Sequence, residues 1–152
     1  MINNKKGDIM FETTYWKVIL MANQTYLGYC SVSLKRRDCG DLAEMTEDEV
    51  LDFLQLAKKL ENSLRKAFDA TMFNWTCLMN LAYQNNPPTP HMHWHFRPRY
   101  SHTVKFVGLE FVDQFFGQHY DWPPTERILD DKTRKLIIDE ILKEIEIDKK
   151  SI

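Results

Sequence analysis

The stretch HMHWHFR, residues 91–97, alternates histidine with apolar side chains. The two sets are His91, His93 and His95, and between them Met92, Trp94 and Phe96. Successive side chains of a β-strand point to opposite faces of a sheet, so this pattern predicts a strand with one apolar face and one histidine face. The apolar face suits packing on a helix, so the histidines are not expected in the core. Three imidazoles on one open face indicate a functional site.

The segments around this stretch have the periodicities of further strands and of two helices. Nearly continuous apolar or β-rich runs predict strands at 16–22, 26–34, 72–82 and 104–111, beside the one at 91–97. Apolar residues at helical spacing predict a long helix over 47–68, and Thr46 with Glu49 matches a capping box at its start. A C-terminal helix is predicted over about 131–147. About five strands grouped around one long helix predict an α+β fold with an antiparallel sheet.

The chain is expected to be one domain. Its 152 residues are enough for one hydrophobic core, and no repeat divides them. Residues 1–14 are expected to be a mobile lead-in to a domain that covers 15–148. Three prolines in residues 84–90 exclude both a helix and an interior strand there, so this segment is predicted to be an irregular loop.

The composition argues against several classes of protein. The chain has 20 Lys+Arg and 22 Asp+Glu, and its net charge of -2 offers no general attraction for nucleic acid. The three cysteines lack C-x-x-C spacing, so neither a disulfide framework nor a Cys-based zinc site is predicted. No apolar run has the pattern of a signal peptide or a membrane span. The expectation is a cytoplasmic protein that binds neither nucleic acid nor membranes.

Two kinds of chemistry fit three alternating histidines. The first is metal binding, in which zinc takes three or four such ligands. Neighbouring Cβ atoms on one strand face lie about 6.6 Å apart, however, so one ion would hardly reach all three side chains. The second is nucleophilic attack on phosphorus, for which an imidazole of pKa about 6.5 is available in its neutral form near pH 7. The metal interpretation therefore ranks second.

The motif HMHWHF is similar to the signature of the histidine triad superfamily of nucleotidyl hydrolases and transferases. Arg97 stands where that signature has an apolar residue. Upstream, YLGYCSVSLKRRDCGDLAEMTEDEV (26–50) resembles the family's strand, basic turn, aspartate–leucine step and helix start. Asn80 lies eleven positions before His91, where the family carries an Asn or Gln that contacts the nucleotide. Residues from about 100 to 124 are less typical, and we expect a lineage-specific extension there.

The resemblance implies a reaction in two steps. His93 would attack the α-phosphorus of a nucleotide conjugate and expel the leaving group, and water would then release a nucleoside monophosphate. His91 and His95 would stabilise the phosphoryl oxygens, and the backbone carbonyl of His91 would fix the tautomer of His93. The resemblance also implies a homodimer that joins two five-stranded sheets. The resemblance implies that no cofactor is required, because the imidazoles supply positive character at the site. A divalent cation bound to the substrate phosphates is compatible with this mechanism.

Besides the histidines, the predicted substrate contacts are Asn80, Tyr29, Arg97, Thr89 and Lys35. Tyr29 stands where the family usually has a further histidine, and it retains a hydroxyl. Pro88 stands where many members carry a Ser or Thr that assists the leaving group, and Thr89 is one step away. Lys35, in the basic turn, could serve a polyphosphate chain. Arg97 is expected on the histidine face, where it either contacts phosphate or forms a surface salt bridge.

These features together predict a hydrolase of nucleoside phosphate conjugates. Dinucleoside polyphosphates such as diadenosine tetraphosphate are the first substrate class, and adenylyl phosphoramidates are the second. Because of Pro88 and Tyr29, a nucleotide-binding regulator with weak turnover stays as an alternative. A His-ligated metallohydrolase is the other alternative.

Overall fold

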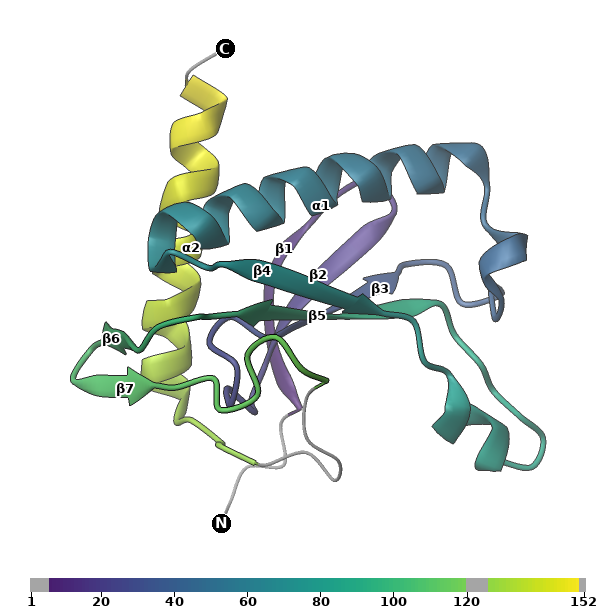
Figure 1. Cartoon of the computed structure of the whole chain (residues 1–152). Coiled ribbons are helices and arrows are strands. Elements are labelled where there is room, and N and C mark those ends of the chain that lie inside the picture. Colours follow the sequence, from purple (N-terminus) through teal and green to yellow (C-terminus); the bar gives the residue numbers. More distant parts are fainter. Residues whose placement is uncertain (1–5, 120–125, 151–152) are drawn as a thin grey trace.

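The structure of the protein, a computed structural model, describes residues 6–119 and 126–150, with side chains in the C-terminal helix described as far as residue 145. Five strands form one antiparallel sheet in the order β1-β2-β3-β5-β4 (Figure 1). Their bounds are β1 Gly7–Glu12, β2 Trp16–Met21, β3 Cys30–Leu34, β4 Met72–Thr76 and β5 His93–Arg99. The two helices are α1 (Glu47–Phe68) and α2 (Asp131–Lys150). This arrangement confirms the predicted α+β fold.

The long helix α1 has the bounds predicted from the sequence. Its first turn contains the expected capping box: the Thr46 hydroxyl accepts from the Glu49 amide, and the Glu49 carboxylate accepts from the Thr46 amide at 2.8 Å. Figure 1 shows α1 lying across one face of the sheet. The inner face of the helix buries Leu56, Leu60 and Leu64.

The apolar side of β5 faces α1. Trp94 stacks on Phe53 of the helix with ring centroids 5.1 Å apart, and Phe96 is fully buried. Full burial of a large apolar side chain is worth about 1.5–3 kcal/mol, so these contacts determine which face of β5 meets the helix. The histidine side of the strand consequently lies on the opposite face of the sheet.

The prediction for the N-terminal segment was wrong in part. Gly7–Glu12, expected in a mobile lead-in, forms the edge strand β1, which pairs with β2 along its length. Asp8 also accepts a hydrogen bond at 2.6 Å from Arg134 of α2, which ties this strand to the C-terminal helix. A partner that lies so far along the chain leaves no local signal in the sequence. Residues 1–5 of the predicted lead-in lie outside the described residues.

The strand predicted over 26–34 is shorter than expected. β3 begins at Cys30, because the residues before it form a turn. In that turn Gly28 has a φ of 85°, and its amide donates to the Gln24 side chain at 2.8 Å. The Gln24 amide nitrogen in turn donates to the carbonyl of Tyr29 at 3.0 Å. The Gln24 side chain thus holds the turn, and the Tyr29 carbonyl also accepts from the Met21 amide of β2 at 3.0 Å, where the ladder with β3 begins.

The strands at 72–82 and 91–97 also have different bounds from those predicted. β4 ends at Thr76, and the 3-10 helix η2 (Asn80–Gln84) occupies the end of the predicted strand. Leu81 of η2 is 74% exposed, so the apolar run that suggested a strand does not mark a buried one. β5 begins at His93, two residues later than expected.

The extension after β5 contains a hairpin in place of the single strand predicted over 104–111. Its strands are β6 (Val104–Phe106) and β7 (Leu109–Phe111). Val107 and Gly108 connect them with φ values of 46° and 79°, the left-handed pair that a tight two-residue turn requires. The chain continues in described residues as far as 119, and the part of the predicted extension at 120–124 lies outside them.

The C-terminal helix α2 begins at Asp131, as predicted, and continues to Lys150, beyond the expected end near 147. Figure 1 shows it crossing behind the C-terminal end of α1. Within the described residues, no helix combines the length and the apolar character needed to cross a membrane.

Candidate active site

β5 presents His93, His95 and Arg97 on the face of the sheet opposite α1. The strand register places His95 between Ser31 of β3 and Thr76 of β4. Directly opposed residues of neighbouring antiparallel strands share a sheet face, so hydroxyl side chains flank His95 on both sides. The rings of His93 and His95 meet edge to face, with centroids 5.0 Å apart and planes at 81°. Two imidazoles and a guanidinium therefore share one surface.

His93 is held by the backbone just before its own strand. Its Nδ1 lies 2.7 Å from the carbonyl oxygen of His91. A carbonyl oxygen only accepts hydrogen bonds, so Nδ1 must carry the proton that joins them. In the neutral ring Nε2 then has an unprotonated lone pair, which is the form that a nucleophile needs.

His91 lies before β5 and is anchored to the basic turn. Its Nε2 donates to the carbonyl oxygen of Arg36 at 3.0 Å. The guanidinium of Arg36 binds the buried Glu49 carboxylate, with Nε 2.5 Å from Oε1 and Nη2 3.1 Å from Oε2. The hydrogen bond from Arg36 lowers the pKa of Glu49, more than burial raises it. The capping box of α1 thus fixes the turn that positions His91.

His95 is part of a hydrogen-bonded chain with two neighbours. Its Nδ1 lies 2.8 Å from the Tyr29 hydroxyl, and Arg97 Nη2 donates to the same hydroxyl at 3.3 Å. The Arg97 guanidinium carbon also lies 4.4 Å from the centre of the Tyr29 ring, within the range of a cation–π contact. Burial, together with the electrostatic effects of His93 and Arg97, lowers the pKa of His95 to about 4. His95 is therefore neutral near pH 7.

Comparison with a family model agrees with this geometry. Residues 3–102, which include all three histidines, match the HIT domain. The chain belongs to the HIT domain family. HIT proteins are nucleotide hydrolases and transferases, so the resemblance to the histidine triad superfamily is confirmed at that level.

Solved HIT proteins share the fold at low sequence identity. A histidine triad protein from Sinorhizobium meliloti superposes with a TM-score of 0.72 at 14% identity, over 91% of this chain and 90% of that one. A hypothetical histidine triad nucleotide-binding protein from Sulfolobus tokodaii gives 0.69 at 18% identity, over 97% of this chain and 89% of that one. A histidine triad protein from Bradyrhizobium japonicum gives 0.69 at 13% identity, over 92% and 91% of the two chains. No curated protein matches the sequence.

Three of the predicted substrate contacts of this HIT protein have other partners or positions. Asn80 is exposed at the start of η2 and does not lie on β4, so the strand face expected to carry it toward the histidines ends at Thr76. Lys35 forms an ion pair with Glu12 at 3.0 Å. The hydroxyl of Thr89 accepts from the Asn85 side chain at 2.9 Å in an exposed loop.

The other two predicted contacts, Tyr29 and Arg97, do lie beside a histidine. Arg97 is on the histidine face, opposite Asn74 of β4. Tyr29 was predicted to contact substrate, and the structure places its hydroxyl on His95. The local sequence could not predict this contact, because Tyr29 and His95 are 66 positions apart in the chain.

Sequence reasoning missed Thr76, which lies next to His95 across the β4–β5 ladder. Its Oγ1 is buried, and it has no hydrogen-bond partner among the described residues. A buried hydroxyl without a protein partner is uncommon and calls for a ligand or water. The even spacing of Asn74 and Thr76 was visible, but only the register with β5 reveals which residue meets His95.

The histidines were also weighed as metal ligands. In the part of the chain that the structure describes, no three His, Cys, Asp or Glu side chains are grouped in a way that could hold a metal ion. Nε2 of His91 and Nδ1 of His93 each have a backbone carbonyl as their partner.

Proposed function

We propose that this HIT protein hydrolyses nucleoside phosphate conjugates through a covalent nucleotidyl intermediate on His93. The observation that carries the proposal is the 2.7 Å contact between His93 Nδ1 and the His91 carbonyl. It leaves Nε2 as the nucleophilic nitrogen, on the face of the sheet that also carries His95 and Arg97. Membership of the HIT family supports the same class of reaction.

The proposed reaction has two displacements at the α-phosphorus. In the first, the Nε2 lone pair of His93 forms a bond to phosphorus, and the bond from phosphorus to the leaving group breaks with its electron pair on the leaving group. In the second, water attacks phosphorus, the P–N bond breaks, and a nucleoside monophosphate is released. The proton that water loses is taken up by the departing imidazole or by solvent.

His95 is proposed to stabilise the phosphoryl oxygens as a neutral donor. In this proposal the Tyr29 hydroxyl, whose oxygen accepts from Arg97, donates its own proton to His95 Nδ1, and the proton of neutral His95 is then on Nε2. An N–H aimed at the developing charge stabilises the transition state without any reorganisation. Arg97, in contact with Tyr29, adds positive charge to the same surface.

The lack of a proton donor at position 88 favours dinucleoside polyphosphates over phosphoramidates as substrates. Pro88 removes the hydroxyl expected near the leaving group, and the hydroxyl of Thr89 lies one position away in an exposed loop, where it accepts from Asn85 at 2.9 Å. A phosphate chain departs as a stable anion, whereas an amine must gain a proton as it leaves. A site without that donor is therefore better matched to a polyphosphate such as diadenosine tetraphosphate.

The test compares two substrates and two variants. Purified protein is incubated with diadenosine tetraphosphate and with a fluorogenic adenylyl amide, and release of nucleoside monophosphate is measured. We expect turnover of the tetraphosphate by the wild type, a loss of at least about 1000-fold in His93→Ala, and no change in His102→Ala, whose side chain is 41% exposed outside the site. Tight binding without product would favour a regulator, and undiminished hydrolysis by His93→Ala would refute the proposed nucleophile.

We also propose that the protein is a homodimer, as the resemblance implies. Two features support an association surface: β4 is an edge strand of the sheet, and α1 exposes apolar side chains, Val50, Leu51 and Leu54, at 47–57% of their surface. Sedimentation equilibrium at micromolar concentration should give about twice the chain mass of 18.1 kDa.

The proposed chemistry requires no protein-bound cofactor, although a divalent cation can accompany the substrate phosphates. Removal of metal ions by a chelator distinguishes the proposed mechanism from that of a metallohydrolase. We expect the protein to retain turnover of the adenylyl amide, which carries no polyphosphate, after dialysis against a chelator. Stoichiometric zinc, with activity lost on chelation and restored by the metal, would establish the metallohydrolase instead.

A further inference from the structure

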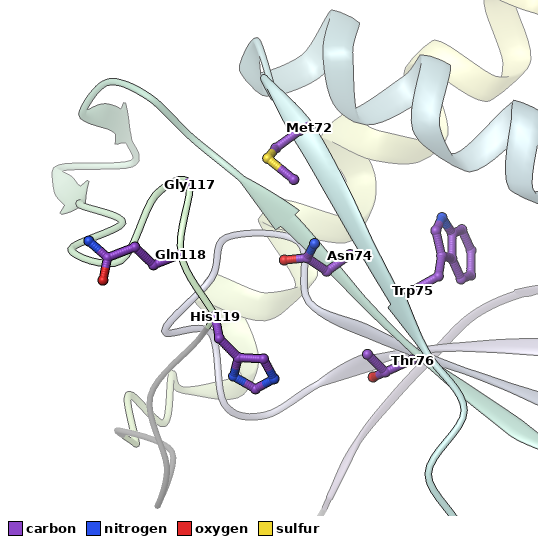
Figure 2. A pocket seen from close by; sticks show the side chains of 7 residues that line it. All are labelled: Met72, Asn74, Trp75, Thr76, Gly117, Gln118 and His119. Atoms are coloured by element: carbon purple, nitrogen blue, oxygen red, sulfur yellow. The ribbon is translucent and has the colours of Figure 1, made fainter.

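A pocket of about 370 Å³ lies on the histidine face between β4 and the end of the extension. Its walls are formed by Met72, Asn74, Trp75, Thr76, Gly117, Gln118 and His119. Figure 2 shows the His119 imidazole projecting from the extension toward Thr76, and the Gln118 side chain turned away from β4. The volume falls within the range of small-molecule sites in proteins.

The pocket borders the proposed active site across the β4–β5 ladder. Thr76 is opposite His95 and Asn74 is opposite Arg97 in the β4–β5 register, so both share a sheet face with the histidines. Only one strand spacing, about 4.8 Å, separates β4 from β5. A group attached to a phosphorus held at His93 and His95 can therefore reach the pocket directly.

The polar groups of this pocket include hydrogen-bond donors. The Thr76 hydroxyl is buried and has no partner among the described residues. The Asn74 carbonyl oxygen accepts from Arg99 at 2.8 Å, which leaves its NH₂ group as the part that can bind a ligand. No carboxylate is among the described residues that line the pocket. Such a lining suits anionic oxygens.

The wall supplied by the extension is held in place by a buried arginine. Arg99 is 1% exposed, and it binds the Asp113 carboxylate with two hydrogen bonds of 2.6 and 3.1 Å. It also donates to the backbone carbonyls of Phe115 at 2.5 Å and Gln118 at 3.0 Å. These bonds order residues 113–118 before any ligand arrives, which reduces the entropy lost on binding.

We propose that this pocket binds the phosphate groups of the substrate beyond the scissile bond, and that Thr76 and His119 contact their oxygens. The proposal rests on the proposed function for the position of the scissile phosphorus. It makes the extension a determinant of specificity: a polyphosphate leaving group occupies the pocket, whereas the short leaving group of an adenylyl amide does not.

The variants Thr76→Val and His119→Ala test this with the two substrates. Valine has nearly the shape of threonine, and it removes a buried hydroxyl without a partner, so no loss of stability is expected. We expect kcat/KM for diadenosine tetraphosphate to fall about tenfold in each variant, while that for the adenylyl amide stays within twofold. His102→Ala is the matched control for a surface histidine, and both values should be unchanged in it.

Two results would overturn the proposal: an equal loss with both substrates, or no loss with the tetraphosphate. If the wild type hydrolyses neither substrate, the proposed function fails. Calorimetry with inorganic triphosphate then tests separately whether the pocket binds phosphate groups. Binding by the wild type that is about tenfold weaker in Thr76→Val and His119→Ala supports the pocket. Absent binding, or equal affinity in all three proteins, rejects it.

Discussion

The hydroxyl of Tyr29 lies 2.8 Å from Nδ1 of His95, and Arg97 donates to that same hydroxyl. The histidine triad family usually has a further histidine where this chain has Tyr29. Arg97 donates to the tyrosine oxygen, so the hydroxyl proton can be donated to Nδ1 of His95. We infer that the replacement keeps His95 in the tautomer that places a proton on Nε2, facing the substrate.

Tyr29→Phe should therefore weaken turnover by changing the proton position on His95. Phenylalanine preserves the ring under Arg97 and removes only the hydroxyl, so we expect kcat to fall about tenfold with little change in KM. Two-dimensional ¹⁵N NMR of the imidazole should show His95 as the Nε2–H tautomer in the wild type and as a mixture of tautomers in the variant.

Two further variants help to interpret the result for Tyr29→Phe. Tyr83→Phe alters a tyrosine that is 62% exposed, and it should leave both kcat and the His95 signals unchanged. Tyr29→His restores the family residue and should recover part of the activity. If Tyr29→Phe turns over substrate at the wild-type rate, the hydroxyl has no role in positioning His95.

The depressed pKa of His95 predicts a specific loss of stability in acid. Burial and the electrostatic effects of two neighbours lower its pKa to about 4 in the folded protein, against about 6.5 in the unfolded chain. Between these values the unfolded state binds more protons, so stability is fully present above pH 6.5 and declines as the pH falls to 4. The contribution at neutral pH is on the order of 3 kcal/mol, with no further change below both pKa values.

Urea unfolding at pH 7.5 and pH 4.5 measures this effect. The wild type should lose more free energy of unfolding between the two pH values than His95→Gln, which lacks the titrating ring. In the wild type, the His95 ¹H resonances should titrate with a midpoint near 4. A midpoint near 6.5, with identical acid sensitivity in the two proteins, would show that His95 is not desolvated.

Asp113→Asn should strongly destabilise the protein. The side chains of Arg99 and Asp113 are both 1% exposed, so the substitution leaves a buried guanidinium without its counter-charge. Breaking a buried pair in this way costs about 3–5 kcal/mol. Glu110→Gln breaks the exposed Lys105–Glu110 pair, whose side chains are 77% and 62% exposed, and should change stability by less than about 1 kcal/mol. Equal urea midpoints for the two variants would contradict the structural role given to Arg99.

Local patterns were sufficient to predict the parts of the fold that depend on one element at a time. The alternation in HMHWHF identified the two faces of β5, and the Thr46–Glu49 pair marked the start of α1. Both signals arise between residues that are close in the chain. The family resemblance added the His91 carbonyl as the partner of His93, and the distance of 2.7 Å agrees with it.

Features that depend on pairing between distant segments could not be predicted. β1 was missed because its contacts are with β2 and with Arg134 of α2. Asn80 was expected on a strand, but β4 ends at Thr76 and Asn80 begins η2, and only the register shows that Thr76 lies opposite His95. The pocket wall depends on Arg99 reaching Asp113 and two carbonyls of the extension, and such contacts leave no periodic signal in the sequence.

Mass spectrometry of the intact protein after brief exposure to diadenosine tetraphosphate tests the central claim most directly. The reaction is quenched in alkali, because a phosphorus–imidazole bond hydrolyses in acid. We expect a fraction of the wild-type protein to gain the mass of one adenylyl group on His93, and no such gain in His93→Ala. Hydrolysis by the wild type together with an adduct that persists in His93→Ala would contradict the assignment of His93 as the nucleophile.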